Sequence, residues 1–295
     1  MLAIRWRPLA SRENQRSTCK RTWPTGGRRR LELSMVTQSA STASRVCVER
    51  QPGLVRLELN NPPLNVINIP MMEELGRELA AVEMDDGVSV IVLSGVGKAF
   101  SAGVDVAAHT PDRVAEMLAK FHAVIRALIA SKKVTIAAVH GTCLGGGAEL
   151  AMVCDMVYTA DSATWGFPEI KQGCYPPVAV TALAAVVGQK RAADLILTGR
   201  TVTGREAAAI GLANCAVPWD QLDAVVTECV DRLVKLSPSA LAISKKATYA
   251  WDSIHFDKGL ARAENIYLQE LIKTEDAQEG IAAFLQKREP HWKGK

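Results

Sequence analysis

Two glutamates stand in settings that could support acid–base chemistry. Glu149 closes the segment 144–149 (LGGGAE), one helical turn after three consecutive glycines. Glu169 follows a proline within 165–170 (WGFPEI), among apolar neighbours. Each has an ordinary explanation when taken singly, because helices favour an acidic residue in their first turn and loop carboxylates usually face solvent. Together, the two carboxylates could activate a water molecule and deliver a proton.

Two glycine-containing loops each follow an apolar run that predicts a buried strand. The first loop, 98–105 (KAFSAGVD), follows 88–94, and the second, 144–149, follows 134–139. Two such loops could present two backbone N–H groups to one oxygen, and each donor of this kind lowers a barrier by about 2.7–4 kcal/mol. A glycine triplet alone more often marks a tight turn. The G-G-G spacing does not match the dinucleotide-binding fingerprint.

The composition is that of an ordinary globular protein of enzyme size. The chain has 295 residues, 48% apolar and 22% charged, enough for a sizeable core. An uninterrupted apolar stretch of about 18 residues, the length of a membrane helix, is absent from the sequence. The seven cysteines form no C-x-x-C pair, which favours reduced thiols over a disulfide framework or a zinc site.

The positive net charge belongs to the N-terminal segment. Residues 1–34 contain nine basic and two acidic residues, a net of +7, which leaves −3 for the remainder of a chain whose total is +4. The body therefore gives no argument for nucleic-acid binding. For 1–34, three interpretations stay open: a presequence, a disordered arm, or a start codon placed too early with Met35 as the true start. We expect a cytoplasmic protein, or a mitochondrial-matrix protein if the segment is a presequence.

Apolar periodicity predicts strands that alternate with helices, and then a helical C-terminal third. This order indicates an α/β body followed by an all-α appendage. The predicted strands cover 46–49, 55–59, 88–94, 134–139, 156–160 and 213–217. The predicted helices cover 71–82, 111–130, a segment from 146, 178–187, 191–197, a segment capped by Thr203, 222–236, 239–251, 259–272 and 274–287.

Several separated segments resemble, in order and spacing, those of the enoyl-CoA hydratase/isomerase (crotonase) superfamily. The resemblance extends from about Val46 to Trp292, and its segments are 59–65, 98–105, 141–155, 166–173, 197–200, 207–213 and 274–288. It implies an α/β fold built as a spiral of ββα turns, with C-terminal helices that mediate trimers or dimers of trimers. We accordingly divide the chain into a basic extension (1–44), a crotonase core (45–218) and a helical trimerisation region (219–295).

The resemblance also implies an acyl-CoA thioester substrate, with no metal or redox cofactor and no nucleic-acid or membrane partner. By position, the backbone N–H groups of Val104 and Gly146 would form an oxyanion hole. Glu149 and Glu169 fall where hydratases carry their catalytic glutamates, and we assign Glu149 to water activation and Glu169 to protonation of Cα. Further matches imply contacts to coenzyme A, in part from a neighbouring subunit, by Leu64, Lys98, Ala102, Phe284 and Lys287.

The segment 173–180 (GCYPPVAV) departs from the family pattern, because ordinary hydratases carry glycines there. We expect Trp165, Tyr175 and Pro176 to form the pocket wall. Together with 100–105 and 109–111, this segment resembles the cyclohexa-1,5-diene-1-carbonyl-CoA hydratases. A cyclic dienoyl thioester and a general enoyl thioester both stay open as substrates.

Two other functions stay open beside hydration. One is a Δ3,Δ2-enoyl-CoA isomerase, although such isomerases commonly lack the first glutamate. The other is a non-catalytic RNA-binding protein on the same fold. A dienoyl-CoA isomerase would need an acid at the position of Pro177. Among other polar residues, His109 could line the pocket, although we favour a solvent-facing position for it. We expect His122 and His140 to be structural, and Asp105 to cap a helix.

Overall fold

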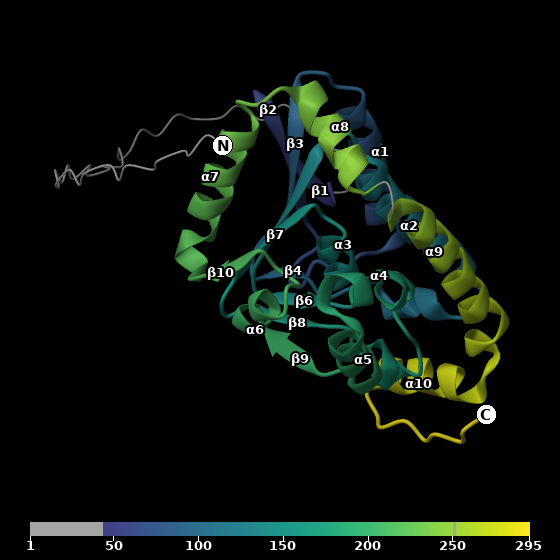
Figure 1. Cartoon of the computed structure of the whole chain (residues 1–295). Coiled ribbons are helices and arrows are strands. Elements are labelled where there is room, and N and C mark those ends of the chain that lie inside the picture. The colour runs from purple at the N-terminus through teal and green to yellow at the C-terminus, as the bar shows by residue number, and fades with distance from the viewer. Residues whose placement is uncertain (1–43, 250–251) are drawn as a thin grey trace, which may run out of the picture. The chain divides into compact units, whose positions relative to one another are not determined.

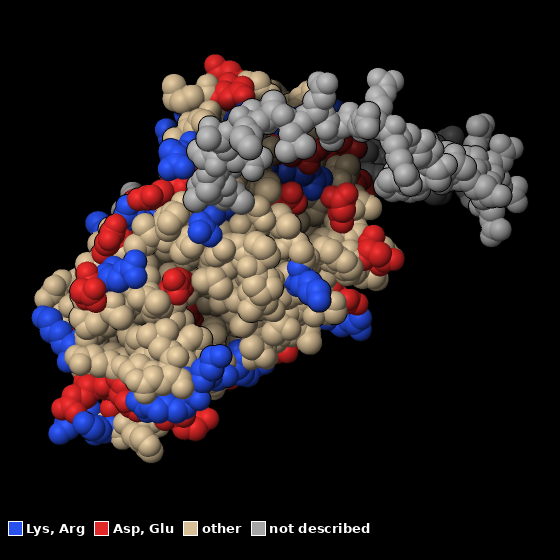
Figure 2. All heavy atoms as spheres, turned by 180° about the vertical axis from the view of Figure 1, so that it is seen from behind, with Lys and Arg blue, Asp and Glu red and all other residues tan. Residues whose placement is uncertain are grey.

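The computed structural model describes residues 44–249 and 252–295, and Figure 1 shows the arrangement of their elements. The three interpretations of residues 1–34 therefore fall outside the described residues. Among the described residues, no helix combines the length and apolar composition that crossing a membrane would require. On the face shown in Figure 2, acidic and basic side chains intermingle around a broad uncharged area. Such mixing gives that face no strong excess of positive charge.

The larger sheet has six strands in the order β1-β2-β3-β5-β7-β10. Only the hairpin between β1 and β2 is antiparallel, and the other neighbours are parallel. Gly53, with φ +78°, permits the tight turn between β1 and β2. The apolar runs of β3 and β5 are buried along their length, as strands covered on both faces must be. The strands are β1 (Val46–Gln51), β2 (Gly53–Leu59), β3 (Val88–Gly95), β5 (Val134–Val139), β7 (Met156–Ala160) and β10 (Cys215–Val217).

A second sheet of four very short strands, in the order β4-β6-β8-β9, was not predicted from the sequence. Its strands are β4 (Ala99–Ser101), β6 (Thr142–Leu144), β8 (Thr164–Gly166) and β9 (Thr201–Thr203). Three residues are too few to establish a hydrophobic period. Because β3, β5 and β7 each continue into a strand of this sheet, the chain repeats one strand–strand–helix turn, and the predicted spiral of ββα turns is confirmed.

The helices agree closely with the predicted segments, and polar caps explain several of their starts. The side chains of Asn68, Thr203 and Thr274 each accept a backbone N–H in the first turn of the helix that follows. The α-helices are α1 (Ile69–Glu83), α2 (Val114–Ala130), α3 (Gly146–Met152), α4 (Pro177–Val187), α5 (Gln189–Thr198), α6 (Gly204–Ala209), α7 (Leu222–Leu233), α8 (Pro238–Thr248), α9 (Asp252–Gln269) and α10 (Glu275–Gln286). Short 3-10 helices occupy η1 (Val106–His109), η2 (Pro168–Gln172), η3 (Trp219–Gln221) and η4 (Leu271–Lys273).

The apolar side chains form two clusters on opposite faces of the six-stranded sheet. The larger cluster joins the sheet to α1, α2, α3, α4 and α9. In the smaller cluster, Leu222, Val226 and Val230 of α7 pack on strand residues such as Val92 and Ile136. Both α7 and α8 contact β3 and β5, and Figure 1 shows α7 beside the strands. Helices α7 and α8 of the region 219–295 therefore cover the sheet, while a trimerisation role for this region stays a prediction.

A buried ion pair ties α8 to the larger sheet. The Lys245 Nζ lies 2.8 Å from Asp155 Oδ2 and donates to the Lys133 carbonyl at 2.9 Å. Asp155 Oδ2 also accepts from the backbone N–H (2.7 Å) and the hydroxyl (2.9 Å) of Thr135 in β5. These additional hydrogen bonds offset the cost of removing both charges from water.

We expect Asp155→Ala to lower the free energy of unfolding by about 3–5 kcal/mol, because it leaves Lys245 buried without its counter-charge. Urea titration of the intact protein measures the change. The control is Glu228→Ala, which breaks an exposed ion pair with Arg232 and should cost less than about 1 kcal/mol. Equal effects of the two substitutions would contradict the role given to the buried pair.

Candidate active site

The carboxyl group of Glu149 is held by the start of another helix. The residue lies in the first turn of α3, and only 3% of it is exposed. Its Oε1 accepts from the backbone N–H groups of Val178 (2.8 Å) and Ala179 (2.9 Å), in the first turn of α4. Pro177 begins α4, where a helix needs no N–H. The partial positive charge of this helix start therefore faces the carboxylate.

Glu169 approaches the same cavity from η2. Its Oε2 is buried and has no hydrogen-bond partner among the described residues. The backbone of Gly145, with φ +51°, passes so close that a Cβ there would lie 2.5 Å from Glu169 Oε1. Glycine is therefore favoured at 145 by its backbone angle, and a Cβ at this position would displace the Glu169 carboxyl group.

Burial raises the pKa of both glutamates above the ordinary value of 4.5. For Glu169, the negative charge of Glu149 raises the pKa further. For Glu149, the N–H groups of Ala179 and Val178 oppose the effect of burial. Because only Glu149 receives two donors, we infer that a singly ionised pair has its charge on Glu149 and its proton on Glu169. Both line one compact cavity of about 60 Å³.

The two glycine loops meet at this cavity, where the predicted donors Val104 and Gly146 lie side by side. A Cβ on Gly146 would lie 3.3 Å from the Val104 nitrogen and 2.6 Å from its Cγ2. Among the described residues, neither N–H donates to another backbone or side-chain group. The structure thus brings together two available donors that the sequence placed far apart.

Hydrogen bonds fix the first of these loops. The Ile67 N–H donates to the Gly103 carbonyl (2.9 Å), and the Asp105 N–H donates to the Ile67 carbonyl (3.1 Å). The Ser101 hydroxyl donates to the Asn65 carbonyl (2.7 Å) and accepts from the Gly103 N–H (3.1 Å). The direction of the Val104 N–H therefore depends on a network that spans two loops.

The residues expected to contact coenzyme A are only partly gathered at the cavity. Ala102 lines it, and its N–H donates to the Leu64 carbonyl at 2.9 Å. Leu64 and Lys98 are exposed, the latter on the turn between β3 and β4. Phe284 is exposed on α10, and Lys287 ends that helix with φ +54°. Neither residue of this last pair lines the cavity of its own chain.

Two of the three residues expected in the pocket wall line the cavity. Tyr175 and Pro176 line the cavity, and the Tyr175 hydroxyl donates to the Ala263 carbonyl at 2.6 Å. Trp165 does not line the cavity. It is fully buried, and its Nε1 donates to the Thr159 hydroxyl at 3.0 Å, so it belongs to the core.

Three further cavity residues were missed or misplaced by sequence reasoning. His109 lines the cavity, although we expected it to face solvent, and its Nδ1 lies 3.1 Å from the Asp105 carbonyl oxygen. His122 of α2 and Tyr267 of α9 also line the cavity. Their packing comes from elements far apart in sequence, so no local motif marks them. Asp105 caps η1 as expected, by accepting from the Ala107 N–H at 3.1 Å.

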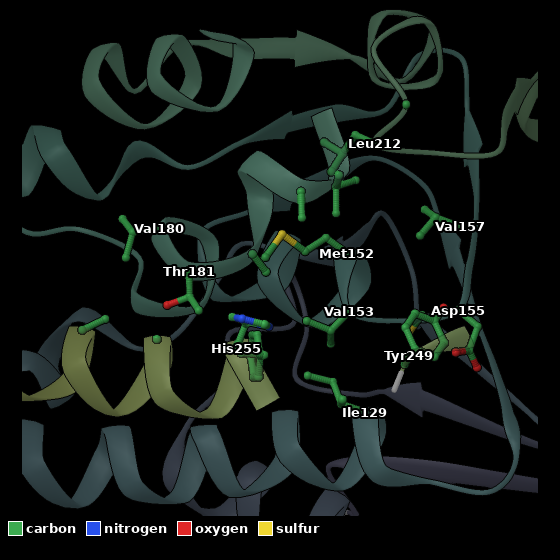
Figure 3. Close-up of a pocket in the computed structure, with 18 of the residues that line it drawn as sticks. Ile129, Met152, Val153, Asp155, Val157, Val180, Thr181, Leu212, Tyr249 and His255 are labelled. Carbon is green, nitrogen blue, oxygen red and sulfur yellow. The ribbon is translucent and has the colours of Figure 1, made fainter. Parts of the chain in front are cut away.

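A larger cavity, of about 920 Å³, lies elsewhere and carries no comparable chemistry. Its lining is mostly apolar, from residues such as Met152, Val153 and Leu212 (Figure 3). Its carboxylate, Asp155, is already held by Thr135 and Lys245. Neither the two glutamates nor the paired N–H groups line it. Among the described residues, no group of three or more metal-ligating side chains could hold an ion.

The buried glutamates predict a pH-dependent stability. Because the pKa of Glu169 is raised from 4.5 by folding, the folded chain holds this proton more tightly than the unfolded chain. As pH rises from 4.5 toward the raised pKa, the free energy of unfolding must therefore fall. The Glu169→Gln variant has no carboxyl group to ionise at this position. We therefore expect it to lose this fall in the free energy of unfolding, which amounts to about 1.4 kcal/mol for each tenfold difference in proton affinity between the folded and unfolded chain.

Urea unfolding at about pH 5 and about pH 9 measures this difference. The exposed Glu116→Gln serves as the control and should follow the wild-type pH dependence. Parallel pH dependences for wild type and Glu169→Gln would refute the raised pKa of this carboxyl group.

Known proteins are similar to this chain in sequence and fold over nearly all of the described residues. Residues 49–295 match the family described as enoyl-CoA hydratase/isomerase. The cyclohexa-1,5-dienecarbonyl-CoA hydratase of Thauera aromatica is 32% identical over 256 residues, which cover 87% of this chain and 99% of the relative. The 2,3-dehydroadipyl-CoA hydratase of Escherichia coli is 34% identical, with coverage of 85% and 100%.

Solved structures agree with this relationship. An enoyl-CoA hydratase from Mycobacterium avium subsp. paratuberculosis has a TM-score of 0.77 at 28% identity, covering 84% of this chain and 98% of that chain. An enoyl-CoA hydratase/isomerase from Xanthobacter autotrophicus has a TM-score of 0.77 at 31% identity, with coverage of 83% and 94%. The fold, the order of the motifs and these similarities together show that the chain belongs to the enoyl-CoA hydratase/isomerase family.

Proposed function

We propose that this protein is an acyl-CoA hydratase, which adds water across the conjugated double bond of an enoyl-CoA or cyclic dienoyl-CoA thioester. The observation that carries this proposal is the pair of glutamates at the cavity, the buried Glu149 and the half-buried Glu169 with its buried Oε2, beside the N–H groups of Val104 and Gly146. Coenzyme A is then part of the substrate, and the chemistry that we assign uses only groups of this chain.

Polarisation of the thioester is the first task of the site. The N–H groups of Val104 and Gly146 would donate to the carbonyl oxygen, which becomes more negative as an enolate develops. Both donors are fixed before the substrate arrives, Val104 by its hydrogen-bonded loop and Gly146 by the start of α3. Little reorganisation is then needed when the charge forms.

The two glutamates would complete the addition. Glu149 takes a proton from water as the oxygen bonds to Cβ, and Glu169 gives its proton to Cα. The product thereby gains one water in total. The reaction leaves the proton on Glu149 and the charge on Glu169, so passage of one proton between them restores the starting state. Because the two groups interact, they would titrate as a pair.

The acyl group is bounded by the Tyr175–Pro176 wall. A cyclic dienoyl substrate is supported by the local resemblance of this wall and by the name of the Thauera aromatica relative. A linear enoyl substrate is supported by the Escherichia coli relative. We keep both within the proposal, because the described wall contains no feature that excludes either one.

A homo-oligomer, a trimer or a dimer of trimers, is the second part of the proposal. Phe284 and Lys287 are exposed on α10 and away from their own cavity. In an oligomer they could reach coenzyme A bound to a neighbouring subunit, while Leu64 and Lys98 contact it from its own subunit. The cytoplasmic location expected from the sequence stays a prediction.

Replacement of either glutamate tests the reaction. We expect Glu149→Gln and Glu169→Gln each to lower kcat by about 10²–10⁴-fold, because each removes a proton transfer while the amide keeps the shape of the side chain. The assay follows the mass gain of one water on crotonyl-CoA, longer enoyl-CoAs and cyclohexadienecarbonyl-CoA. Glu116→Gln, an exposed glutamate on α2, is the control.

Near-normal turnover in both glutamate variants would contradict the mechanism. Entry of ¹⁸O from labelled water distinguishes hydration from double-bond isomerisation, in which the product contains no solvent oxygen. RNA binding that depends on residues 1–34, without activity on any acyl-CoA, would favour the non-catalytic alternative.

The glycine turn supplies a separate test. We expect Gly146→Ala to lower kcat by about 10²–10³-fold, because its Cβ would meet Val104 Cγ2 at 2.6 Å and push the two donors apart. Gly97→Ala is the matched control, since a Cβ at this glycine has open space around it, although its φ of +82° will cost some stability. Unchanged turnover in Gly146→Ala would refute the oxyanion role.

A further inference from the structure

The cavity has two buried polar atoms that the proposed hydration does not use. They are His122 Nε2, from α2, and the Tyr267 hydroxyl, from α9. His122 is 0% exposed and Tyr267 is 1% exposed, and neither atom has a nitrogen or oxygen hydrogen-bond partner among the described residues. Leaving a polar group buried and unpaired costs about 1–3 kcal/mol. A group bound in the cavity would supply the hydrogen bonds that these two atoms lack.

The protonation of His122 follows from its other nitrogen. His122 Nδ1 forms a hydrogen bond with Glu264 Oε1, and Arg126 Nη2 lies 3.4 Å from the same oxygen. A carboxylate can only accept, so Nδ1 carries the proton and Nε2, on a side chain that lines the cavity, keeps a lone pair without a partner. Burial lowers the pKa of His122, which favours this neutral form.

The Tyr267 hydroxyl is able to donate as well as accept. Its ring packs edge-on against Tyr175, with centroids 5.3 Å apart, but the Tyr175 hydroxyl is engaged with the Ala263 carbonyl. The hydroxyl lies within hydrogen-bond reach of the Cys174 sulfur, which is a weak acceptor and itself donates to the Gln172 carbonyl at 3.6 Å. A bound oxygen is a stronger acceptor than this sulfur and would replace it as the partner of the Tyr267 proton.

Charge restricts what these two atoms can receive. A carboxylate on the bound acyl group would be repelled by the negative charge shared by Glu149 and Glu169 in the same cavity. An alkyl group would leave both polar atoms unpaired. A hydroxyl group satisfies both, because it can donate to His122 Nε2 and accept from Tyr267.

We propose that the acyl pocket selects a compact acyl group that carries a hydroxyl beyond the conjugated double bond, held between His122 Nε2 and the Tyr267 hydroxyl. This inference rests on the proposed function, since it names the substrate class of the same site. The small volume of the cavity, about 60 Å³, favours a compact group over a long chain.

Binding of unreactive saturated esters tests the preference without requiring turnover. Hydroxyl-ended butanoyl-, pentanoyl- and hexanoyl-CoA are each titrated calorimetrically against the methyl-ended ester with the same number of heavy atoms. We expect the hydroxyl ester to bind at least about tenfold more tightly at one or more of these lengths. Tyr267→Phe and His122→Phe should each reduce this ratio by about tenfold or abolish it.

Tyr158→Phe is the matched control, because Tyr158 packs against the smaller apolar cluster and does not line the cavity, so it should keep the hydroxyl-to-methyl binding ratio. If His122→Phe does not fold, Tyr267→Phe decides the question, since it removes a single oxygen. Equal binding of both esters at every length, or a ratio that survives Tyr267→Phe, would overturn the proposal. A water molecule that satisfied both atoms would give this outcome.

The unsaturated forms of the same esters separate this inference from the proposed function. A hydroxyl preference in binding, without hydration of any unsaturated ester, would sink the proposed reaction and leave the binding site standing. Hydration without a hydroxyl preference in binding would overturn this inference and leave the reaction standing.

Discussion

Two carboxyl groups buried at one cavity are the constraint on which the rest of the site depends. Glu149 and Glu169 cannot both ionise there without a large desolvation and repulsion cost. The chain stabilises one charge, at Glu149, with the N–H groups that begin α4, and gives Glu169 no comparable donor. Two identical side chains therefore have different surroundings, which favour the charge on Glu149 and the proton on Glu169.

The short strands of the second sheet create this arrangement. Strands β4, β6 and β8 lie side by side, so the loops that follow them converge, although they are separated by about 40 and 20 residues in sequence. The β4 loop carries Val104, the β6 loop leads to Gly146 and Glu149, and Glu169 follows β8. Gly145 is favoured by its φ of +51°, and a Cβ on Gly146 would lie 2.6 Å from Val104 Cγ2. The two glutamates and the N–H groups of Val104 and Gly146 thus share one structural origin.

Much of the six-stranded sheet and most helices could be predicted, because runs such as 88–94 and 134–139 carry a long apolar signal and Thr203 marks a cap. The second sheet could not, since three-residue strands have no period. The glutamates were recognisable from their motifs. His122 and Tyr267 were not, because their positions at the cavity depend on the packing of α2 against α9. Trp165 proved to belong to the core.

The most direct test of the acid–base assignment is a count of protons on the buried pair. Carbon-13 NMR of enzyme labelled at glutamate carboxyl carbons, titrated through neutral pH, follows each carboxyl group separately. We predict one buried carboxyl that is still protonated near neutral pH, with a signal that Glu169→Gln removes and the control Glu116→Gln retains. Two carboxylates already ionised near their ordinary pKa would contradict it.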